Sequence, residues 1–270
     1  MSPEAGEGNG GGITPVTQAL VLAAGRGSRL GRHTSKPLFP LLGVPLLART
    51  LFTLQQAGIT DVWVVLGYEG ERVRREIDQI RRLKIRVHWV ENPRWEEPNG
   101  VSVLAAEEHL ERPFVLTMSD HLFQPGAVER LRAGASDSPG LDLVVDYETE
   151  DVLDPEDATR VRLEGDRIVE IGKGLEAYDA IDTGVFLASP ALFEALREAG
   201  EGPSLSEGVQ ALAAQGRARV VDGSDLPWQD VDTPEDVQAA RRLLLSRWPK
   251  ETDGPVSRYI NRPISTRITR

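Results

Sequence analysis

A glycine-rich, positively charged segment follows the first apolar run of the chain. It extends from Leu22 to Gly31, and Ser35-Lys36-Pro37-Leu38 comes shortly after it. Glycines let backbone N–H groups approach phosphate oxygens, while Arg26, Arg29 and Lys36 supply positive charge. The segment predicts a triphosphate-binding loop, the alternative being a tight strand-to-helix turn with solvated arginines. It lacks the Gly-Lys-Ser/Thr ending of a Walker loop and the third glycine of a dinucleotide fingerprint.

Lysine is rare in this chain, which has 27 Arg and only four Lys, at positions 36, 84, 173 and 250. A compact ammonium suits a point contact with a phosphate, where a planar guanidinium would not fit. Lys36 and Lys173 are therefore candidates for specific contacts with phosphates.

Two groups of carboxylates are candidates for a divalent cation. Asp120 follows the apolar run 114–118, and Asp230 and Asp232 lie on one side of an extended segment before a helix that begins at Thr233-Pro234. Mg2+ prefers oxygen ligands, which favours these carboxylates over His121. His121 is expected to contact substrate or to be exposed, and a capping role for Asp120 is the alternative.

Apolar runs of strand length alternate with helix-length segments between residues 18 and 246. This alternation predicts an α/β fold with a mostly parallel, mixed sheet covered on both faces. The expected strands are 19–24, 62–66, 85–90, 114–118, 141–147, 159–164, 167–171, 183–188 and 218–222. The expected helices are 46–57, 69–81, 101–110, 125–132, 190–198, 205–215 and one from 233 or 234 to about 246.

Composition limits the classes of function. The 270 residues include 42 acidic and 31 basic side chains, giving a net charge of −11, and no Cys. Disulfides and Cys-ligated metals are excluded, and the acidic balance argues against nucleic-acid binding. No apolar run has the ~20 residues of a membrane span, and no secretory signal is present, so we expect a soluble chain. Three regions are expected: a disordered tail (1–16), a catalytic domain (17–248) and a basic linker (249–270).

The glycine-rich segment with Lys36-Pro37 behind it closely resembles the nucleotidyltransferase family that joins a nucleoside triphosphate to a phosphorylated alcohol or sugar. The resemblance covers roughly residues 17–245 and implies a Rossmann-like three-layer α/β/α domain. It implies that Lys36 holds the α-phosphate, that Arg29, Lys36 and Lys173 are catalytic, and that Mg2+ is the cofactor. Implied Mg2+ ligands are Asp120 and Asp232, with Asp230 as a further candidate. Implied nucleotide-binding residues are Leu22, Ala23, Ala24, Gly25, Arg26, Gly27, Ser28, Arg29, Lys36, Asn99, Gly100 and Ser102. Implied acceptor-binding residues are Glu170, Lys173, Asp182 and Thr183.

Residues 252–270 resemble the segment that leads into the membrane-embedded CDP-alcohol phosphotransferase domain of bifunctional enzymes making di-inositol phosphate. That second domain's aspartate signature is absent, so we expect the chain to stop before it. The resemblance implies CTP and inositol 1-phosphate as substrates, CDP-inositol and pyrophosphate as products, and a place at the cytoplasmic face of a membrane without insertion by this fragment. Phosphocholine or a hexose 1-phosphate are alternative acceptors. A non-catalytic nucleotide-binding regulatory subunit is the alternative from another class, and a basic disordered tail is the alternative for 252–270.

Overall fold

The computed structural model describes residues 16–30, 35–134, 140–149, 157–246 and 248. Almost all of the expected N-terminal tail and the whole of the expected linker 249–270 lie outside the described residues. Both remain predictions.

A nine-stranded mixed sheet forms the centre of the domain, in the order β5-β4-β1-β6-β10-β7-β11-β9-β8. Its first four strands are parallel to one another: β5 (Arg86–Glu91), β4 (Asp61–Leu66), β1 (Gln18–Ala23) and β6 (Phe114–Met118). Because all four run the same way, their carboxyl ends meet at one edge, where open α/β sheets bind ligands.

Antiparallel pairing enters in the other half of the sheet. The long strand β10 (Ala180–Ala188) is antiparallel to β6 and to β7 (Leu141–Asp146), whereas β11 (Ala218–Asp222) is parallel to β7. A hairpin of β8 (Arg160–Glu164) and β9 (Arg167–Gly172) completes the sheet, and β8 also pairs with β10. A bulge between Asp182 and Phe186 interrupts the register of β10 beside the site.

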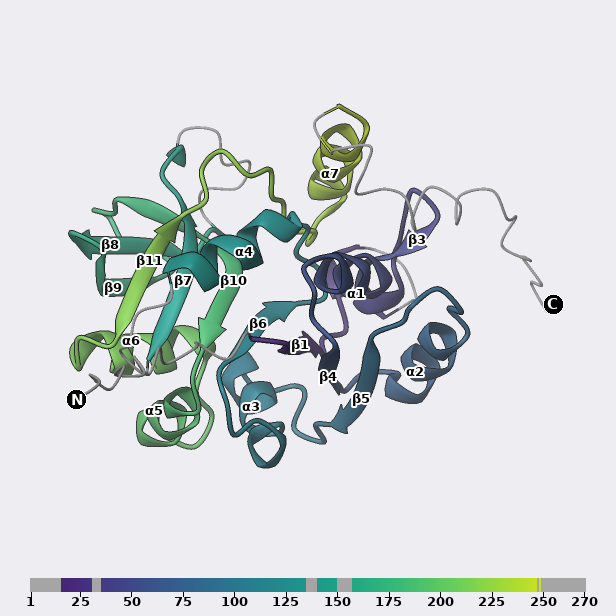
Figure 1. Cartoon of the computed structure of the whole chain (residues 1–270), viewed down its shortest axis with the longest axis horizontal. Coiled ribbons are helices and arrows are strands. Elements are labelled where there is room, and N and C mark those ends of the chain that lie inside the picture. Colours follow the sequence, from purple (N-terminus) through teal and green to yellow (C-terminus); the bar gives the residue numbers. More distant parts are fainter. Residues whose placement is uncertain (1–15, 31–34, 135–139, 150–156, 247, 249–270) are drawn as a thin grey trace, which may run out of the picture.

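Helices cover both faces of the sheet (Figure 1), so the expected three-layer α/β architecture with a mixed sheet is confirmed. One face packs against α3 (Asn99–Leu104), α5 (Ala191–Ala199) and α6 (Leu205–Ala214). The opposite face packs against α1 (Leu46–Gln56), α2 (Gly70–Asp78) and α4 (Pro125–Gly134). Side chains of β1 alternate between these two cores, with Leu20 and Leu22 on one side and Ala19 and Val21 on the other, which explains its unbroken apolar run.

A smaller apolar cluster attaches the last helix. α7 (Pro234–Ser246) contributes Ala240 and Leu244, which pack with Leu41 of the short hairpin formed by β2 (Pro40–Leu41) and β3 (Val44–Pro45). Val231, just before α7, is fully buried in the same cluster. This burial fixes the extended segment that carries Asp230 and Asp232.

The expected helix over 101–110 is wrong in its extent. α3 begins at Asn99 and ends at Leu104, and a separate 3-10 turn covers Glu107–His109. The hairpin of β2 and β3 was not anticipated at all. Within the described part of the chain, no helix combines the length and the apolar character needed to cross a bilayer.

Candidate active site

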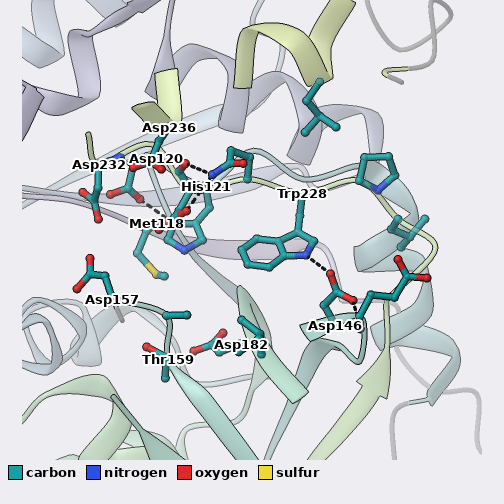
Figure 2. A pocket seen from close by; sticks show the side chains of 18 of the residues that line it. Met118, Asp120, His121, Asp146, Asp157, Thr159, Asp182, Trp228, Asp232 and Asp236 are labelled. Carbon is teal, nitrogen blue, oxygen red and sulfur yellow. Dashed lines mark hydrogen bonds and ion pairs between the residues drawn. The ribbon is translucent and has the colours of Figure 1, made fainter. Parts of the chain in front are cut away.

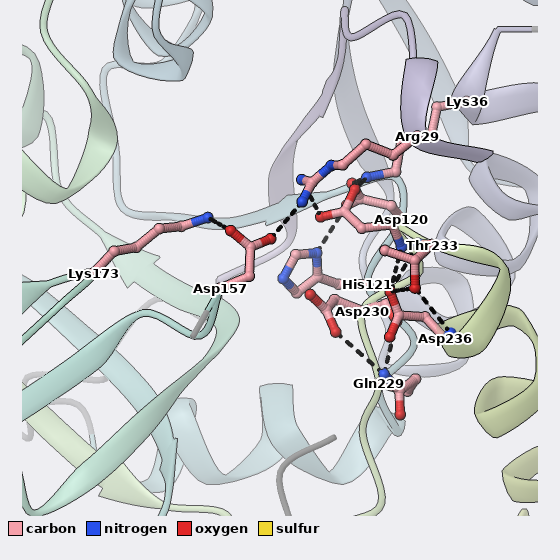
Figure 3. Close-up of polar contacts among 11 residues, drawn as sticks. Arg29, Lys36, Asp120, His121, Asp157, Lys173, Gln229, Asp230, Thr233 and Asp236 are labelled. Carbon is pink, nitrogen blue, oxygen red and sulfur yellow. Dashed lines mark hydrogen bonds and ion pairs between the residues drawn. The ribbon is translucent and has the colours of Figure 1, made fainter. Parts of the chain in front are cut away.

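The side chains singled out by the sequence converge at the carboxyl ends of β1 and β6. The loop after β1 carries Arg29 in a 3-10 turn (Ser28–Leu30), and Lys36 begins a second 3-10 turn (Lys36–Leu38). Asp120 follows β6, and Asp232 precedes α7. Figure 3 shows Arg29, Lys36 and Asp120 facing one another. Asp232, from a third distant part of the chain, contacts both Arg29 and Lys36.

The glycine-rich loop is shaped to pack against Lys36. Gly27 has a φ of +70°, and a Cβ built on it would lie 2.5 Å from the Cβ of Lys36, so a larger residue would strain the backbone and displace Lys36. Around Gly25, by contrast, a Cβ would meet nothing within 4 Å. The loop therefore packs against Lys36 at Gly27, whereas the space beside Gly25 is open.

Lys36 is the centre of a buried charge network. Its Nζ contacts Asp120 Oδ2 and Asp232 Oδ1, and only 11% of its side chain is exposed. Burial lowers the pKa of this ammonium, but the Asp120 and Asp232 carboxylates outweigh burial and raise it overall. Burial would also raise the pKa of Asp120, yet Lys36 and His121 hold it well below its usual range. Asp120 is therefore ionised, and one oxygen of Asp120 and one of Asp232 contact the same ammonium.

A second chain of ion pairs leads away from this centre. Arg29 donates from Nη2 to Asp232 at 3.0 Å and from Nη1 to Asp157 at 2.7 Å. The other oxygen of Asp157 contacts Lys173 Nζ. Figure 3 shows Asp157 between the two cations, so one carboxylate links residues 29 and 173.

His121 lies between three carboxylates. Its Nδ1 donates to Asp120 Oδ1 at 2.8 Å, and burial, which lowers the imidazole pKa, is outweighed by that carboxylate, so the pKa is raised. Gly184 makes room for the ring, because a Cβ at this glycine would lie 2.1 Å from His121 Cδ2. His121 is therefore a packed residue that orients Asp120, not an exposed one.

Asp182 and Asp230 face the same region with fewer partners. Asp182 accepts one hydrogen bond, from Gly184 N at 2.7 Å, and burial raises its pKa to about 6. Burial also raises the pKa of Asp230, which accepts from Gln229 Nε2 at 3.2 Å. Neither forms an ion pair with a Lys or Arg among the described residues.

Two cavities meet at this network. One, of about 350 Å³, lies over the glycine-rich loop, and the other, of about 460 Å³, opens toward β7 and β10 (Figure 2). Both are bounded by Asn99, Met118, Asp120 and Asp232. Two molecules bound in these cavities would touch at the Asp120–Lys36–Asp232 contact, which suits the transfer of a group from one to the other.

Most of the expected nucleotide-binding residues line the smaller cavity: Leu22, Ala24, Gly25, Gly27, Ser28, Arg29, Lys36, Asn99 and Ser102. Three others do not. Ala23 points into the core on the far side of the sheet, and Arg26 lies over the ring of Tyr68, 5.2 Å from its centre. Gly100 packs against Pro203, where a Cβ would lie 2.4 Å from the carbonyl oxygen.

Some of the expected acceptor-binding residues line the larger cavity, and others do not. Lys173 and Asp182 line the larger cavity. Glu170 instead pairs with Arg162 across the β8–β9 hairpin, at 2.9 Å, and Thr183 is buried with its hydroxyl donating to Val144 O at 2.7 Å. Both are thus placed by sheet packing, and neither lines either cavity.

Several lining residues were missed by sequence reasoning. Asp157 and Asp146 lie in the larger cavity with Trp228, and Trp95 lines the smaller one. Asp157 belongs to an acidic stretch without periodicity, so no pattern marked it. Trp228 directly precedes the acidic segment 229–232, and that position was the available signal.

The residues present fit a divalent cation bound together with a triphosphate. In the described part of the chain, no group of three or more His, Asp and Glu is assembled as a complete ligand set. Asp120 and Asp232 nevertheless present oxygens to one point, and Mg2+ is commonly held by one or two carboxylates plus substrate phosphates. Asp230 lies nearby but contacts Gln229, so its role as a third ligand remains a prediction.

Comparisons with known proteins agree with this geometry. Residues 19–222 match the model of the MobA-like NTP transferase domain. The chain is 45% identical over 251 residues to a "Bifunctional IPC transferase and DIPP synthase" of Rubrobacter xylanophilus, covering 90% of this chain and 55% of that protein. A protein of the same name from Thermococcus kodakarensis is 38% identical, with 93% of this chain and 56% of the relative covered. The chain therefore spans about half the length of the curated relatives it matches.

A solved structure is similar over nearly its whole length. The inositol-1-phosphate CTP transferase of T. maritima superposes with a TM-score of 0.78 and 26% identity, covering 89% of this chain and 98% of that one.

Proposed function

The chain belongs to the MobA-like NTP transferase family, and from this premise we propose that it transfers the cytidylyl group of CTP to inositol 1-phosphate, giving CDP-inositol and pyrophosphate. The names of the relatives and of the T. maritima structure support this choice of substrates. The observation that carries it is the meeting of two cavities at Lys36, Asp120 and Asp232.

In the proposed reaction, CTP occupies the smaller cavity and inositol 1-phosphate the larger one. A phosphate oxygen of the acceptor attacks the α-phosphorus in line, a P–O bond forms, and the bond to the leaving pyrophosphate breaks. A phosphate monoester is already a nucleophile near neutral pH, so no general base is required. Catalysis then rests on positioning and on neutralising the charge of the phosphates.

Each cation of the network has a place in this scheme. Lys36 lines the smaller cavity, contacts Asp120, which lines both cavities, and is assigned to the α-phosphate. Arg29, on the nucleotide side, is assigned to the β- and γ-phosphates, and Lys173, on the other side, to the acceptor phosphate. Asp157 orients both Arg29 and Lys173.

Asp120 and Asp232 would hold Mg2+, which when bound neutralises phosphate charge and polarises the α-phosphate. Their fixed positions come from the network itself: His121 orients Asp120, and Arg29 holds Asp232. Lys36, which contacts both carboxylates, would lie beside the bound cation and could also donate to the phosphates.

The acceptor cavity favours a polyhydroxy compound over phosphocholine. A quaternary ammonium is recognised by a cage of aromatic rings, whereas the described lining of this cavity has Trp228 as its one indole, phenol or phenyl ring. Carboxylates such as Asp182 instead accept hydrogen bonds from hydroxyl groups.

Pyrophosphate release tests the proposal. The chain is assayed with Mg2+ and inositol 1-phosphate, offering CTP, UTP, ATP, GTP and dTTP separately, and then with CTP and phosphocholine, or with UTP or dTTP and a hexose 1-phosphate. Turnover with CTP and inositol 1-phosphate is expected. Turnover restricted to another acceptor would reassign the substrate, and nucleotide binding without any turnover would favour a regulatory subunit.

Two variants distinguish loss of a metal ligand from loss of the fold. Asp120→Ala is expected to abolish Mg2+-dependent turnover, whereas Asp78→Ala, an exposed acid of α2 beside Arg74, should leave it unchanged. Thermal unfolding of both variants checks that the fold is retained. Near-normal activity of Asp120→Ala would contradict the assignment.

We also propose that residues 249–270 connect this domain to a membrane CDP-alcohol phosphotransferase domain in a longer protein at the cytoplasmic face of a membrane. The support is that the bifunctional relatives are roughly twice the matched length. Co-sedimentation of the longer gene product with membranes, with this domain exposed to protease on the cytoplasmic side, tests it.

A further inference from the structure

Trp228 forms a wall of the larger cavity. It lies in the segment between β11 and α7, is half-buried, and lines the cavity. In Figure 2 its indole ring lies inside the cavity, between His121 and Asp146. The ring is thus part of the surface that a molecule bound in the cavity would contact.

Contacts on two sides fix the orientation of this ring. The indole Nε1–H donates to Asp146 Oδ2 at 2.8 Å, and the other oxygen of Asp146 accepts from Glu148 N at 2.8 Å. The backbone next to the ring is held as well, since Gln229 and Leu122 exchange two hydrogen bonds, of 2.8 and 3.0 Å. Both carboxylate oxygens of Asp146 therefore accept hydrogen bonds within the protein. We infer that Asp146 orients the indole ring and does not bind a ligand.

Carboxylates line the same cavity as the Trp228 ring, where they could accept hydrogen bonds from the hydroxyl groups of a polyol. Asp182 and Asp230 line the same cavity, and each has a carboxylate with few protein partners among the described residues. A cyclic polyol has an apolar C–H face and a rim of hydroxyl groups. An aromatic ring is complementary to the C–H face, and carboxylate oxygens are complementary to the hydroxyl groups.

We propose that Trp228 is the platform on which the C–H face of a polyhydroxylated ring acceptor rests, and that Asp146 is a positioning residue that sets the angle of the indole. This inference rests on the proposed function for the chemical class of the acceptor. It adds the residues that select a ring among phosphorylated acceptors.

Steady-state kinetics of pyrophosphate release, with CTP, inositol 1-phosphate and Mg2+, tests the platform. Trp228→Ala is expected to raise the KM for inositol 1-phosphate about 10-fold or more and to leave the KM for CTP within about 2-fold. Trp228→Phe, which keeps an aromatic face, should stay within about 3-fold for both substrates. Trp95→Ala is the matched control, because it removes an indole from the nucleotide cavity and should raise the KM for CTP instead.

The positioning role of Asp146 is tested by rescue and by coupling. Asp146→Ala leaves the indole N–H without its acceptor and should raise the KM for inositol 1-phosphate several-fold, whereas Asp146→Asn keeps an oxygen acceptor and should restore most of it. In the Trp228→Phe background, which has no N–H, Asp146→Ala should have little further effect on this KM. A purely structural role would give equal losses in both backgrounds and in the KM for CTP.

The outcomes for this inference and for the proposed function are distinguishable. An active wild-type chain whose acceptor KM is unchanged in Trp228→Ala overturns the platform and leaves the function intact. Wild-type turnover with a hexose 1-phosphate instead overturns the choice of inositol, and the same KM comparison then tests the platform on another ring. Turnover confined to phosphocholine, or no turnover with any ring acceptor, overturns both.

Discussion

Replacing Asp182 with Asn is expected to make the protein more stable at neutral pH and less active. Asp182 lies at the bulge of β10, and burial raises its pKa to about 6, opposed by the Gly184 N–H and His121 and reinforced by Asp230. Its usual value is 3.8. The folded protein therefore binds this proton more tightly than the unfolded chain does.

The sign and size of the expected stability change follow from this difference between the pKa values of the folded and unfolded states. Between about pH 4 and pH 6 the folded state holds more protons at Asp182, so its contribution to the free energy of unfolding falls as pH rises through that range. Each pKa unit corresponds to about 1.4 kcal/mol, which gives a ceiling of ~3 kcal/mol. Since the side chain is open to the cavity, water screens part of this cost, and we expect Asp182→Asn to gain about 1–2 kcal/mol above pH 6.

Urea unfolding at several pH values measures the gain. The stability difference between Asp182→Asn and wild type should be near zero at about pH 4, grow through pH 6 and then level off. Asp61→Asn is the control of opposite sign, because hydrogen bonds from Arg86 hold the pKa of Asp61 well below its usual range. That variant should lose stability above about pH 4. A gain for Asp182→Asn that is absent at neutral pH, or that does not shrink in acid, would refute the reasoning.

Substitutions at four further positions test the network. Lys36→Ala should lower kcat by at least ~100-fold. Lys36→Arg should not restore kcat, because a planar guanidinium cannot replace an ammonium held between Asp120 and Asp232. A kcat within tenfold of wild type in initial-rate assays would contradict this. Gly27→Ala should cost about 1–3 kcal/mol of stability because of its positive φ and its contact with Lys36, while Gly25→Ala, in open space, should melt like wild type. Asp157→Asn releases Arg29 and Lys173 from a competing carboxylate, so inorganic phosphate should inhibit about 3-fold more strongly against the acceptor; an unchanged inhibition constant would exclude this competition.

The strands and their layers were predictable because burial on two faces leaves a strong local pattern. The ranges 114–118 and 218–222 are both predicted and observed as strands, since continuous apolar runs end at turn residues. The helix over 101–110 was overextended because its second half, Ala105 to His109, contains neither glycine nor proline. Its break is set by packing and by a 3-10 turn, which leave no local signal.

The loops at the carboxyl ends of β1 and β6 were predictable for a different reason, namely that their charges follow buried strands. The side of the sheet that each acceptor residue faces was not predictable. Thr183 was placed beside Asp182 in the acceptor site, but the bulge and Val144 turn its hydroxyl inward. Trp228 depends on Asp146, 82 residues away, and such a pairing exists only once β7 and the segment before α7 have come together.

The charge network explains how strongly charged groups can lie in one small buried region. Lys36 neutralises the two carboxylates assigned to the cation, and Asp157 neutralises the two cations assigned to phosphates. For Lys36, Asp120 and Asp232, which are largely buried, this pairing offsets a desolvation that would otherwise cost several kcal/mol per ion. Arg29 and Lys173 are half-exposed, so water already screens much of their charge. We expect Asp120 and Asp232 to hold Mg2+ if it binds with the substrates, and Lys36, Arg29 and Lys173 to hold the phosphates. Among the described residues, Asp182 and Asp230 form no ion pair with a Lys or Arg, and their pKa values are raised. We therefore expect these two carboxylates to accept hydrogen bonds from the hydroxyl groups of the proposed acceptor.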